Sequence, residues 1–327
     1  MQIQPATSDS KYKEILDAVG MQKRHLILPV FVQERQEERE EKELQIAMMP
    51  GITKIPLNKI IQRIGVIVDA GIASIIIFGI PEKIDERGAF ASSTDGVVQQ
   101  ALRKIRKEYG NQLNVITDVC LCQYNTSGHC GLVSNNRVDN DSTLDSLSKI
   151  ALSHAEAGAD MVAPSSMMDG QVYSIRKTLK KHGFKKTKII SYSVKQLSSL
   201  YTPFRSAAFS KMCKFNLIDK SSYQVSYTNP RQILREVQTD IREGADIVMI
   251  KPGITSLDII CMIKENFDFP IGVQNVSGEY AMIKAAAMHG WIDEEEWKIS
   301  SIASIKRSGA DMIVSYFSMD VARYLDD

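Results

Sequence analysis

Two lysines stand at the ends of apolar runs, where an amine is suited to covalent chemistry. Lys195 ends the run Ser-Tyr-Ser-Val-Lys, and Lys251 ends the run Ile-Val-Met-Ile-Lys. Burial disfavours an ammonium and lowers its pKa, and the free amine that results attacks ketones to form a Schiff base. Two such lysines predict a reaction in which two carbonyl substrates are each held as an imine. The alternative is that both side chains extend from strand ends into solvent.

A cysteine-rich loop, DVCLCQYNTSGHCG, provides the second group of candidate residues. Cys120 and Cys122 project from the same side of an extended segment, and the glycines let the loop bring Cys130 back to them. Three thiolates fill three positions of a tetrahedral zinc and leave the fourth open, as in catalytic zinc sites. We favour these three cysteines over His129 as ligands. The alternative is a set of ordinary buried cysteines.

Cations also mark the segment that follows the first lysine. Arg205 lies in Tyr-Thr-Pro-Phe-Arg, and Lys220 follows at the far end of a long loop. A guanidinium suits bidentate binding of a carboxylate. The segment therefore predicts a lid over an anionic substrate.

One short phrase recurs along the chain and indicates the elements that must position these residues. Gly-Ala-Asp followed by an apolar run occurs at Gly158, Gly244 and Gly309, with a looser copy at Gly71. A glycine that ends a helix, followed by a short run of buried residues, is typical of the joint between a helix and a parallel strand. The chain contains eight such apolar runs, at residues 26–31, 74–78, 114–117, 160–163, 188–192, 246–250, 271–273 and 311–315.

Eight parallel strands with intervening helices predict a (β/α)8 TIM barrel in the α/β class. A doubly wound open sheet is the alternative, although no Gly-x-Gly-x-x-Gly follows a strand. In barrels the chemistry lies at the carboxyl ends of the strands, so polar residues there should converge. They are Asp118, Cys120, Ser165, Lys195, Lys251, Ser277 and Tyr316.

We divide the chain into an extended N-terminal arm, residues 1–24, and a catalytic barrel, residues 25–327. The arm precedes the first strand, and we expect it to make an oligomer contact. The charge run at residues 33–43 is interpreted as a solvated helix or mobile loop at the rim of the site.

Composition excludes several classes of protein. The 327 residues carry a net charge of +1, which gives no footprint for nucleic acid or membrane. The N-terminus lacks the apolar core of a signal peptide, and no run is long enough to span a bilayer. Five cysteines fit a reducing cytoplasm, and Cys213 and Cys261 are interpreted as structural. We expect a cytoplasmic enzyme with no nucleic-acid or membrane partner.

Five long motifs then point to a family. They are DVCLC and GHCG within residues 118–131, APSSMMDG at 163–170, SYSVK at 191–195, GAD to IKP within 244–252, and VSGEYAM at 276–282. Over nearly its whole length the chain resembles the porphobilinogen synthase family, also called δ-aminolevulinic acid dehydratase. The resemblance implies a (β/α)8 barrel with an N-terminal arm, assembled as a homo-octamer. It also implies condensation of two 5-aminolevulinate molecules into porphobilinogen, with loss of two waters, in tetrapyrrole and haem biosynthesis.

The resemblance assigns roles residue by residue. Lys251 corresponds to the lysine that binds the first substrate, on the propionate side, and Lys195 to the lysine that binds the second, on the acetate side. Asp118 is similar to a polar group near the second substrate and the zinc. The remaining matches are the zinc ligands of the zinc-dependent branch (Cys120, Cys122, Cys130), the carboxylate binders of the second substrate (Arg205, Lys220) and those of the first (Ser277, Tyr316).

A last match, Glu236, corresponds to a glutamate that holds an allosteric magnesium at subunit contacts in many relatives. Its alternative is a solvated helix carboxylate. The chain departs from the family pattern at three positions. Ser166 stands where many relatives have aspartate, and Lys220 stands where arginine is common. Gln274 lies just before Val-Ser-Gly, where many relatives have an aromatic residue. Two rival functions are a class I aldolase, which needs only one lysine and no cysteine site, and a catalytically idle zinc-binding barrel.

Overall fold

Eight parallel strands close into a barrel in the computed structural model, which describes residues 8–34, 44–209 and 219–326. Each barrel strand pairs with the next one along the chain, and the last returns to the first through Leu26 and Ile313. The strands are β1 (Leu26–Gln33), β4 (Ser74–Ile80), β5 (Asn114–Val119), β8 (Met161–Pro164), β9 (Lys188–Lys195), β10 (Ile247–Lys251), β11 (Ile271–Gln274) and β12 (Met312–Val314). The predicted (β/α)8 barrel is confirmed, and the doubly wound sheet is wrong.

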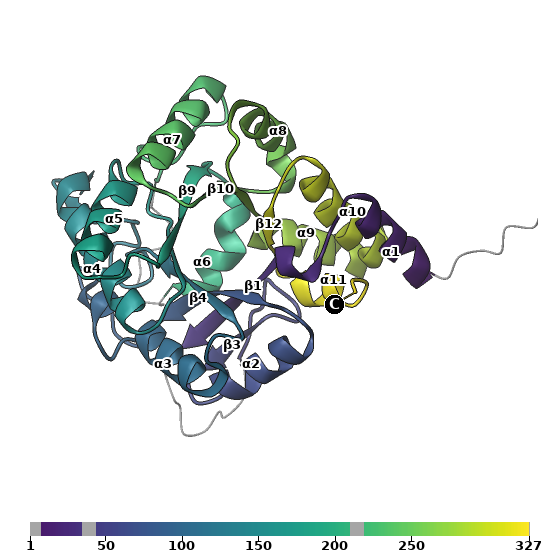
Figure 1. The fold of residues 1–327 in the computed structure, drawn as a ribbon, viewed down its shortest axis with the longest axis horizontal. Coiled ribbons are helices and arrows are strands. Elements are labelled where there is room, and N and C mark those ends of the chain that lie inside the picture. The colour runs from purple at the N-terminus through teal and green to yellow at the C-terminus, as the bar shows by residue number, and fades with distance from the viewer. Residues whose placement is uncertain (1–7, 35–43, 210–218, 327) are drawn as a thin grey trace, which may run out of the picture.

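Helices surround the strands (Figure 1). The longer ones are α1 (Ser8–Ala18), α2 (Ile60–Asp69), α3 (Val97–Tyr109), α4 (Asn140–Glu156), α5 (Gln171–Lys181), α7 (Pro230–Glu243), α8 (Leu257–Asn266), α9 (Ser277–Met288) and α10 (Glu294–Arg307). Short elements complete the described chain: β2 (Leu44–Gln45), β3 (Thr53–Pro56), β6 (Leu132–Ser134), β7 (Arg137–Asp139), α6 (Thr202–Ala208) and α11 (Ser318–Ala322). In Figure 1, α6 lies over the middle of the ring of strands.

The recurring Gly-Ala-Asp phrase ties neighbouring strands together. Asp160 accepts a hydrogen bond of 2.7 Å from the backbone N–H of Val115 in the adjacent strand and pairs with Arg106. Gly158 has a φ of 107°, and a Cβ there would lie 2.8 Å from Cγ of Arg106. The other two copies repeat this arrangement, with Asp246 bound to Ile189 and Arg176, and Asp311 bound to Ile271 and Lys264. The phrase therefore fixes the joint through both its glycine and its carboxylate.

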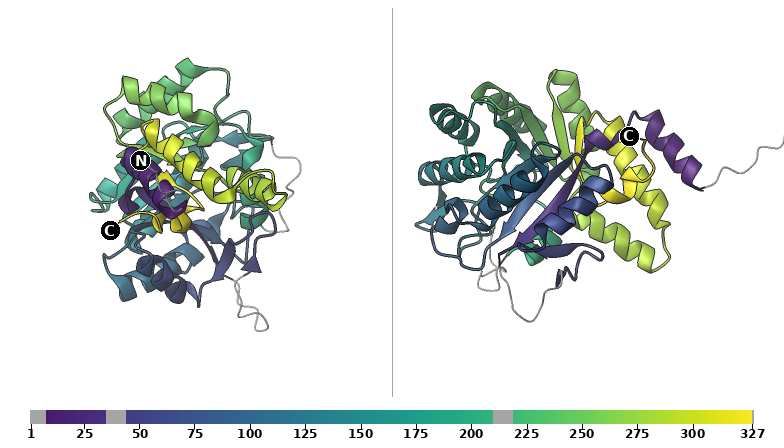
Figure 2. Two further views of the ribbon diagram at one scale, coloured as in Figure 1. Left: turned by 90° about the vertical axis from the view of Figure 1, so that its right-hand side faces the viewer. Right: turned by 60° about the horizontal axis from the view of Figure 1, so that its bottom comes forward.

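The described part of the N-terminal arm packs on its own barrel. Tyr12 of α1 is 7% exposed, and Leu16 is fully buried. The ring of Tyr12 meets that of Tyr324 edge-on at 5.5 Å, and Lys13 pairs with Asp326. Figure 2 shows α1 beside the C-terminus. The division at residue 24 and the oligomer contact of the arm stay predictions.

Some predictions fall outside the described residues. The charge run at residues 33–43 is described only at Gln33 and Glu34, and Cys213 lies within the segment 210–218 that the structure does not describe. Cys261 is a free, exposed cysteine on α8, and its interpretation as structural stays a prediction. Among the described helices, none has the length and apolar character needed to cross a membrane.

Candidate active site

The two predicted lysines lie side by side at the carboxyl end of the barrel. Lys195 ends β9 and Lys251 ends β10, and their Cα atoms are direct partners across the two strands. Their exposed fractions are 7% and 6%. The alternative in which both side chains extend into solvent is therefore wrong.

Aromatic rings surround the amine of Lys251. Its Nζ lies 4.9 Å from the ring centroid of Tyr201, 5.4 Å from that of Phe204 and 5.6 Å from that of Tyr192. Burial lowers the pKa of Lys251 to about 7, and the nearby positive charge of Lys195 contributes to the lowering. The expected neutral amine is confirmed here, because a pKa near 7 leaves a large fraction unprotonated at neutral pH.

Lys195 lies in a different electrostatic environment. Its Nζ donates a hydrogen bond of 2.5 Å to the backbone oxygen of Ser165, at the end of β8. Burial lowers its pKa, but the negative charges of the cysteine thiolates and of Asp118 outweigh burial, so the pKa is raised. Lys195 therefore differs from Lys251, whose pKa is lowered.

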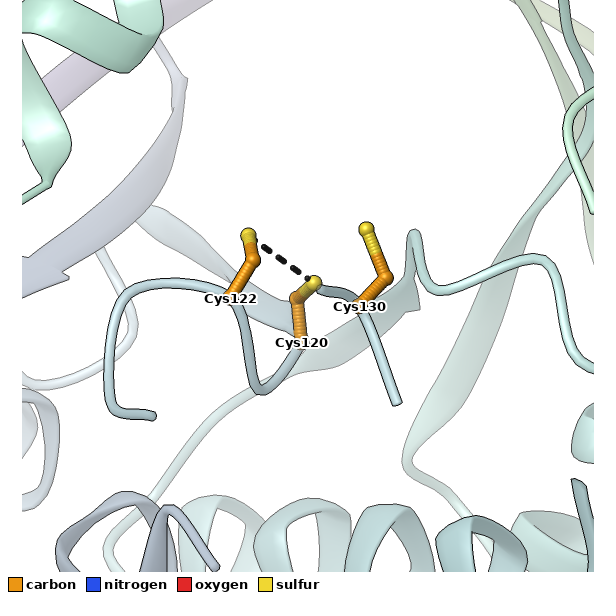
Figure 3. A group of neighbouring side chains, drawn as sticks. All are labelled: Cys120, Cys122 and Cys130. Atoms are coloured by element: carbon orange, nitrogen blue, oxygen red, sulfur yellow. Dashed lines mark hydrogen bonds between the residues drawn. The ribbon is translucent and has the colours of Figure 1, made fainter. Parts of the chain in front are cut away.

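Three cysteine sulfurs form one cluster beside these lysines. The Sγ atoms of Cys120, Cys122 and Cys130 all lie within 4.8 Å of one another, and all three residues are buried. Figure 3 shows the three thiols pointing to the same side of the loop. His129 is not part of this cluster, because its Nδ1 lies 3.1 Å from the hydroxyl of Tyr223. The cluster could bind a metal.

The thiols differ in their protonation. Hydrogen bonds from Cys120 and Cys122 hold the pKa of Cys130 well below its ordinary value. The pKa of Cys122 is raised well above its ordinary value, first by its hydrogen bond with Cys120, and burial raises the pKa of Cys120 to about 11. Without a cation, three buried thiolates so close together would repel one another. Three soft sulfur ligands converging on one point fit zinc.

Most of the predicted residues line a small cavity between the strand ends and α6. Its volume is about 30 Å³. Its walls include Asp118, Cys122, Cys130, Ser165, Lys195, Arg205, Lys220 and Lys251. Asp118 is buried with no hydrogen-bond partner at Oδ1, and burial raises its pKa to about 6. A cavity of this size holds water rather than two substrates, so some of the groups that line it must move to admit them.

The predicted carboxylate binders fall into two groups. Arg205 and Lys220 line the cavity, and the Nζ of Lys220 donates a hydrogen bond of 3.3 Å to the Sγ of Cys130. Ser277 and Tyr316, in the second group, do not line the cavity. The Ser277 hydroxyl donates to the backbone oxygen of Leu200 and accepts from the backbone N–H of Phe204. Tyr316 is buried, and its hydroxyl has no partner.

Other residues of the site were missed at the level of sequence. Phe204 contacts the rings of Phe31 and Phe78 and so closes the cavity. Gln224 also lines it, and its buried Oε1 has no partner. Tyr201 donates hydrogen bonds to the backbone oxygens of Gln196 and Lys251. Their position in the sequence could have identified two of them, because Phe204 is next to Arg205 and Gln224 is four residues after Lys220.

Two departures from the family pattern have structural consequences. Gln274 accepts a hydrogen bond of 3.0 Å from the hydroxyl of Tyr192, whose ring lies 5.6 Å from the amine of Lys251. Ser166 is fully buried, and its hydroxyl lies 3.5 Å from the backbone oxygen of Val119. Neither substitution leaves a gap in the polar contacts of the site.

Glu236 lies away from the lysines, on α7. It lines a separate, open cavity of about 930 Å³ together with Asp169 and Asp240. Burial raises the pKa of Glu236, and these two carboxylates raise it further. The surroundings of Glu236 are therefore acidic.

Comparison with known proteins decides the family. The model of the delta-aminolevulinic acid dehydratase family matches residues 2–324. The chain belongs to this family. The resemblance inferred from the five motifs is confirmed, and with it the prediction of an enzyme that condenses two 5-aminolevulinate molecules to porphobilinogen in haem biosynthesis.

Relatives and a solved structure agree over almost the full chain. The delta-aminolevulinic acid dehydratase of Archaeoglobus fulgidus is 46% identical over 92% of this chain and 91% of its own. That of Staphylococcus epidermidis is 42% identical over 98% and 97%. The crystal structure of the Toxoplasma gondii enzyme, in complex with the reaction product porphobilinogen, matches with a TM-score of 0.89. It is 33% identical and covers 99% of this chain and 92% of its own.

Proposed function

We propose that this enzyme condenses its two substrates through Schiff bases on Lys195 and Lys251. One observation carries the proposal: two buried lysines are direct partners across neighbouring strands at the carboxyl end of the barrel, and both line one cavity. Each ketone oxygen leaves as water when its imine forms, so two imines account for both waters of the condensation. Holding both substrates in fixed mutual orientation avoids a large entropic cost of bringing them together.

Lys251 is assigned the first substrate, on the propionate side. Its low pKa supplies a neutral amine without an additional base. Tyr201 and Phe204 of the α6 region cover it, so the imine would form in a site from which water is excluded. Once α6 moves, the hydroxyls of Ser277 and Tyr316 would bind the carboxylate of this substrate.

Lys195 is assigned the second substrate, on the acetate side, with Asp118 beside it. Arg205 and Lys220 would bind the carboxylate of this substrate, because both cations line the cavity. Lys220 would have to leave the sulfur of Cys130 to do so.

Cys120, Cys122 and Cys130 would hold a zinc ion. When bound, zinc would act as a Lewis acid. Its positive charge would also offset the negative charge of the thiolates, which raises the pKa of Lys195. Asp118, with its free Oδ1 in the cavity, would exchange a proton with the second substrate.

The test of this assignment is chemical trapping. Borohydride added with 5-aminolevulinate is expected to reduce an imine on Lys251, and under some conditions on Lys195. The adducts are located by peptide mapping. Active enzyme in which neither lysine is modified would contradict the mechanism.

The rate of imine formation at Lys251 is expected to rise with pH and level off above about pH 7. Only the neutral amine attacks a ketone, so the rate falls about tenfold for each pH unit below the pKa. The measurement is the initial rate of borohydride-trapped adduct on Lys251 across pH. A rate that still rises above about pH 9 would indicate an ordinary lysine with a pKa near 10.4 and would contradict the prediction.

Magnesium is expected to raise activity by roughly severalfold and to favour a larger oligomer, for which we propose an octamer. Glu236 lies among carboxylates, a setting suited to a hard cation bound largely through water. Glu236→Ala should lose this response but keep zinc and imine formation. Gln238→Ala, on an exposed position of the same helix, is the control. Sedimentation and activity across a magnesium titration give the answer, and an unchanged response in Glu236→Ala would make this residue a solvated carboxylate.

A further inference from the structure

The strand that carries Lys195 contains one residue more than its neighbour. The Cα partners between β9 and β10 are Ile190–Ile247, Ser191–Val248, Val194–Ile250 and Lys195–Lys251. Three steps along β9, from 191 to 194, therefore match two steps along β10, from 248 to 250. This is a β-bulge at Tyr192 and Ser193.

The bulge changes the direction in which Lys195 points. Tyr192 faces the barrel interior, where its hydroxyl donates to Gln274 and its ring lies near the amine of Lys251. Strict alternation would place Lys195, three residues further on, on the opposite face of the strand, toward the outer helices. The extra residue restores the inward direction. Both lysines consequently face the same cavity.

A carboxylate from outside the barrel holds the outer side of this bulge. Asp240 of α7 accepts a hydrogen bond of 2.7 Å at Oδ2 from the hydroxyl of Ser191. Burial raises the pKa of Asp240, while hydrogen bonds from Ser191 and Ser193 lower it in part. The Ser193 hydroxyl also lies 3.4 Å from the backbone oxygen of Ser191. One carboxylate thus contacts the residues on both sides of Tyr192.

We propose that Asp240 is a positioning residue, whose carboxylate holds the β9 bulge and thereby aims the amine of Lys195 at the second substrate. This inference rests on the proposed function, because it gives Asp240 a part in the chemistry at Lys195 in addition to its place among the carboxylates around Glu236. Lys251 ends a different strand, where its amine also contacts the rings of Tyr201 and Phe204, so we expect its imine to depend on the bulge far less than that of Lys195.

The experiment compares four single variants of the full-length enzyme in zinc, each assayed with and without magnesium, because Asp240 also lies beside Glu236. Asp240→Ala removes the acceptor, and Asp240→Asn keeps an oxygen that can accept from Ser191. Ser191→Ala removes the donor. Glu243→Ala is the matched control, since this carboxylate on the same helix contacts the backbone N–H of Tyr173 instead. The readouts are kcat, borohydride trapping on Lys251, zinc content and melting temperature.

Asp240→Ala is expected to lower kcat by roughly tenfold to a hundredfold, because small misplacements of a reacting group are costly, while Lys251 trapping and zinc content stay as in the parental enzyme. Asp240→Asn should recover most of the activity. Ser191→Ala should also lower kcat. Adding it to Asp240→Ala should cost little more activity, because both substitutions remove the same hydrogen bond.

Unchanged kcat in Asp240→Ala, or an equal loss of Lys251 trapping and kcat, would overturn the inference. If Asp240→Ala does not fold, the comparison of Ser191→Ala with Glu243→Ala decides in the same way. A parental enzyme that gives no adduct on Lys251 would contradict the proposed function instead, so the two failures are distinguishable.

Discussion

Replacing Lys251 with methionine is expected to lower turnover by about four orders of magnitude or more. Methionine fills a similar volume in the aromatic surroundings of Tyr192, Tyr201 and Phe204 but has no nucleophilic nitrogen. The first substrate would then remain a free ketone, because the other amines that line the cavity, those of Lys195 and Lys220, are assigned to the second substrate. Borohydride trapping on this peptide should disappear together with turnover.

The control for this variant is Lys188→Ala, at the exposed beginning of β9. It should keep the activity and zinc content of the parental enzyme. Lys251→Met should also keep its zinc. Its melting temperature should fall by no more than a few degrees, because the substitution replaces a buried amine, which is costly to desolvate, with an apolar side chain. Turnover within about tenfold of the parental value would show that Lys251 forms no essential covalent intermediate.

The sequence was sufficient to predict the barrel and the convergence of its polar residues. Each Gly-Ala-Asp copy precedes a short apolar run, which is the pattern expected of a parallel strand buried on both faces. Once eight such runs are recognised, the carboxyl ends of their strands must meet at one mouth. Lys195, Lys251 and the cysteine loop therefore had to lie close together, although Cys120 and Lys251 are 131 positions apart in the sequence.

Other features depend on distances that a sequence does not contain. The direction of Lys195 follows from a bulge, and nothing in Ser-Tyr-Ser-Val-Lys distinguishes a bulged strand from a regular one. Its raised pKa follows from the nearby thiolates, whereas burial alone would have lowered it. The closure of the cavity by Phe204 depends on how α6 packs over the strands. Ser277 was predicted to bind substrate, but its hydroxyl is engaged with this same segment.

Removing zinc is expected to abolish turnover reversibly, with a loss of about a thousandfold or more. Three buried thiols within 4.8 Å of one another, one of them with a strongly lowered pKa, are arranged to bind a soft divalent cation. Cys130→Ala should lower zinc content and turnover together, because Cys130 carries the sulfur most easily ionised. Cys261→Ala, on the exposed face of α8, is the matched control and should change neither.

Zinc is measured by elemental analysis before chelation, after chelation and after zinc is restored, with turnover assayed at each stage. Full activity in metal-stripped enzyme would place this chain outside the zinc-dependent branch. Loss of turnover in Cys130→Ala with zinc still bound would instead indicate that the thiolate acts through its contact with Lys220.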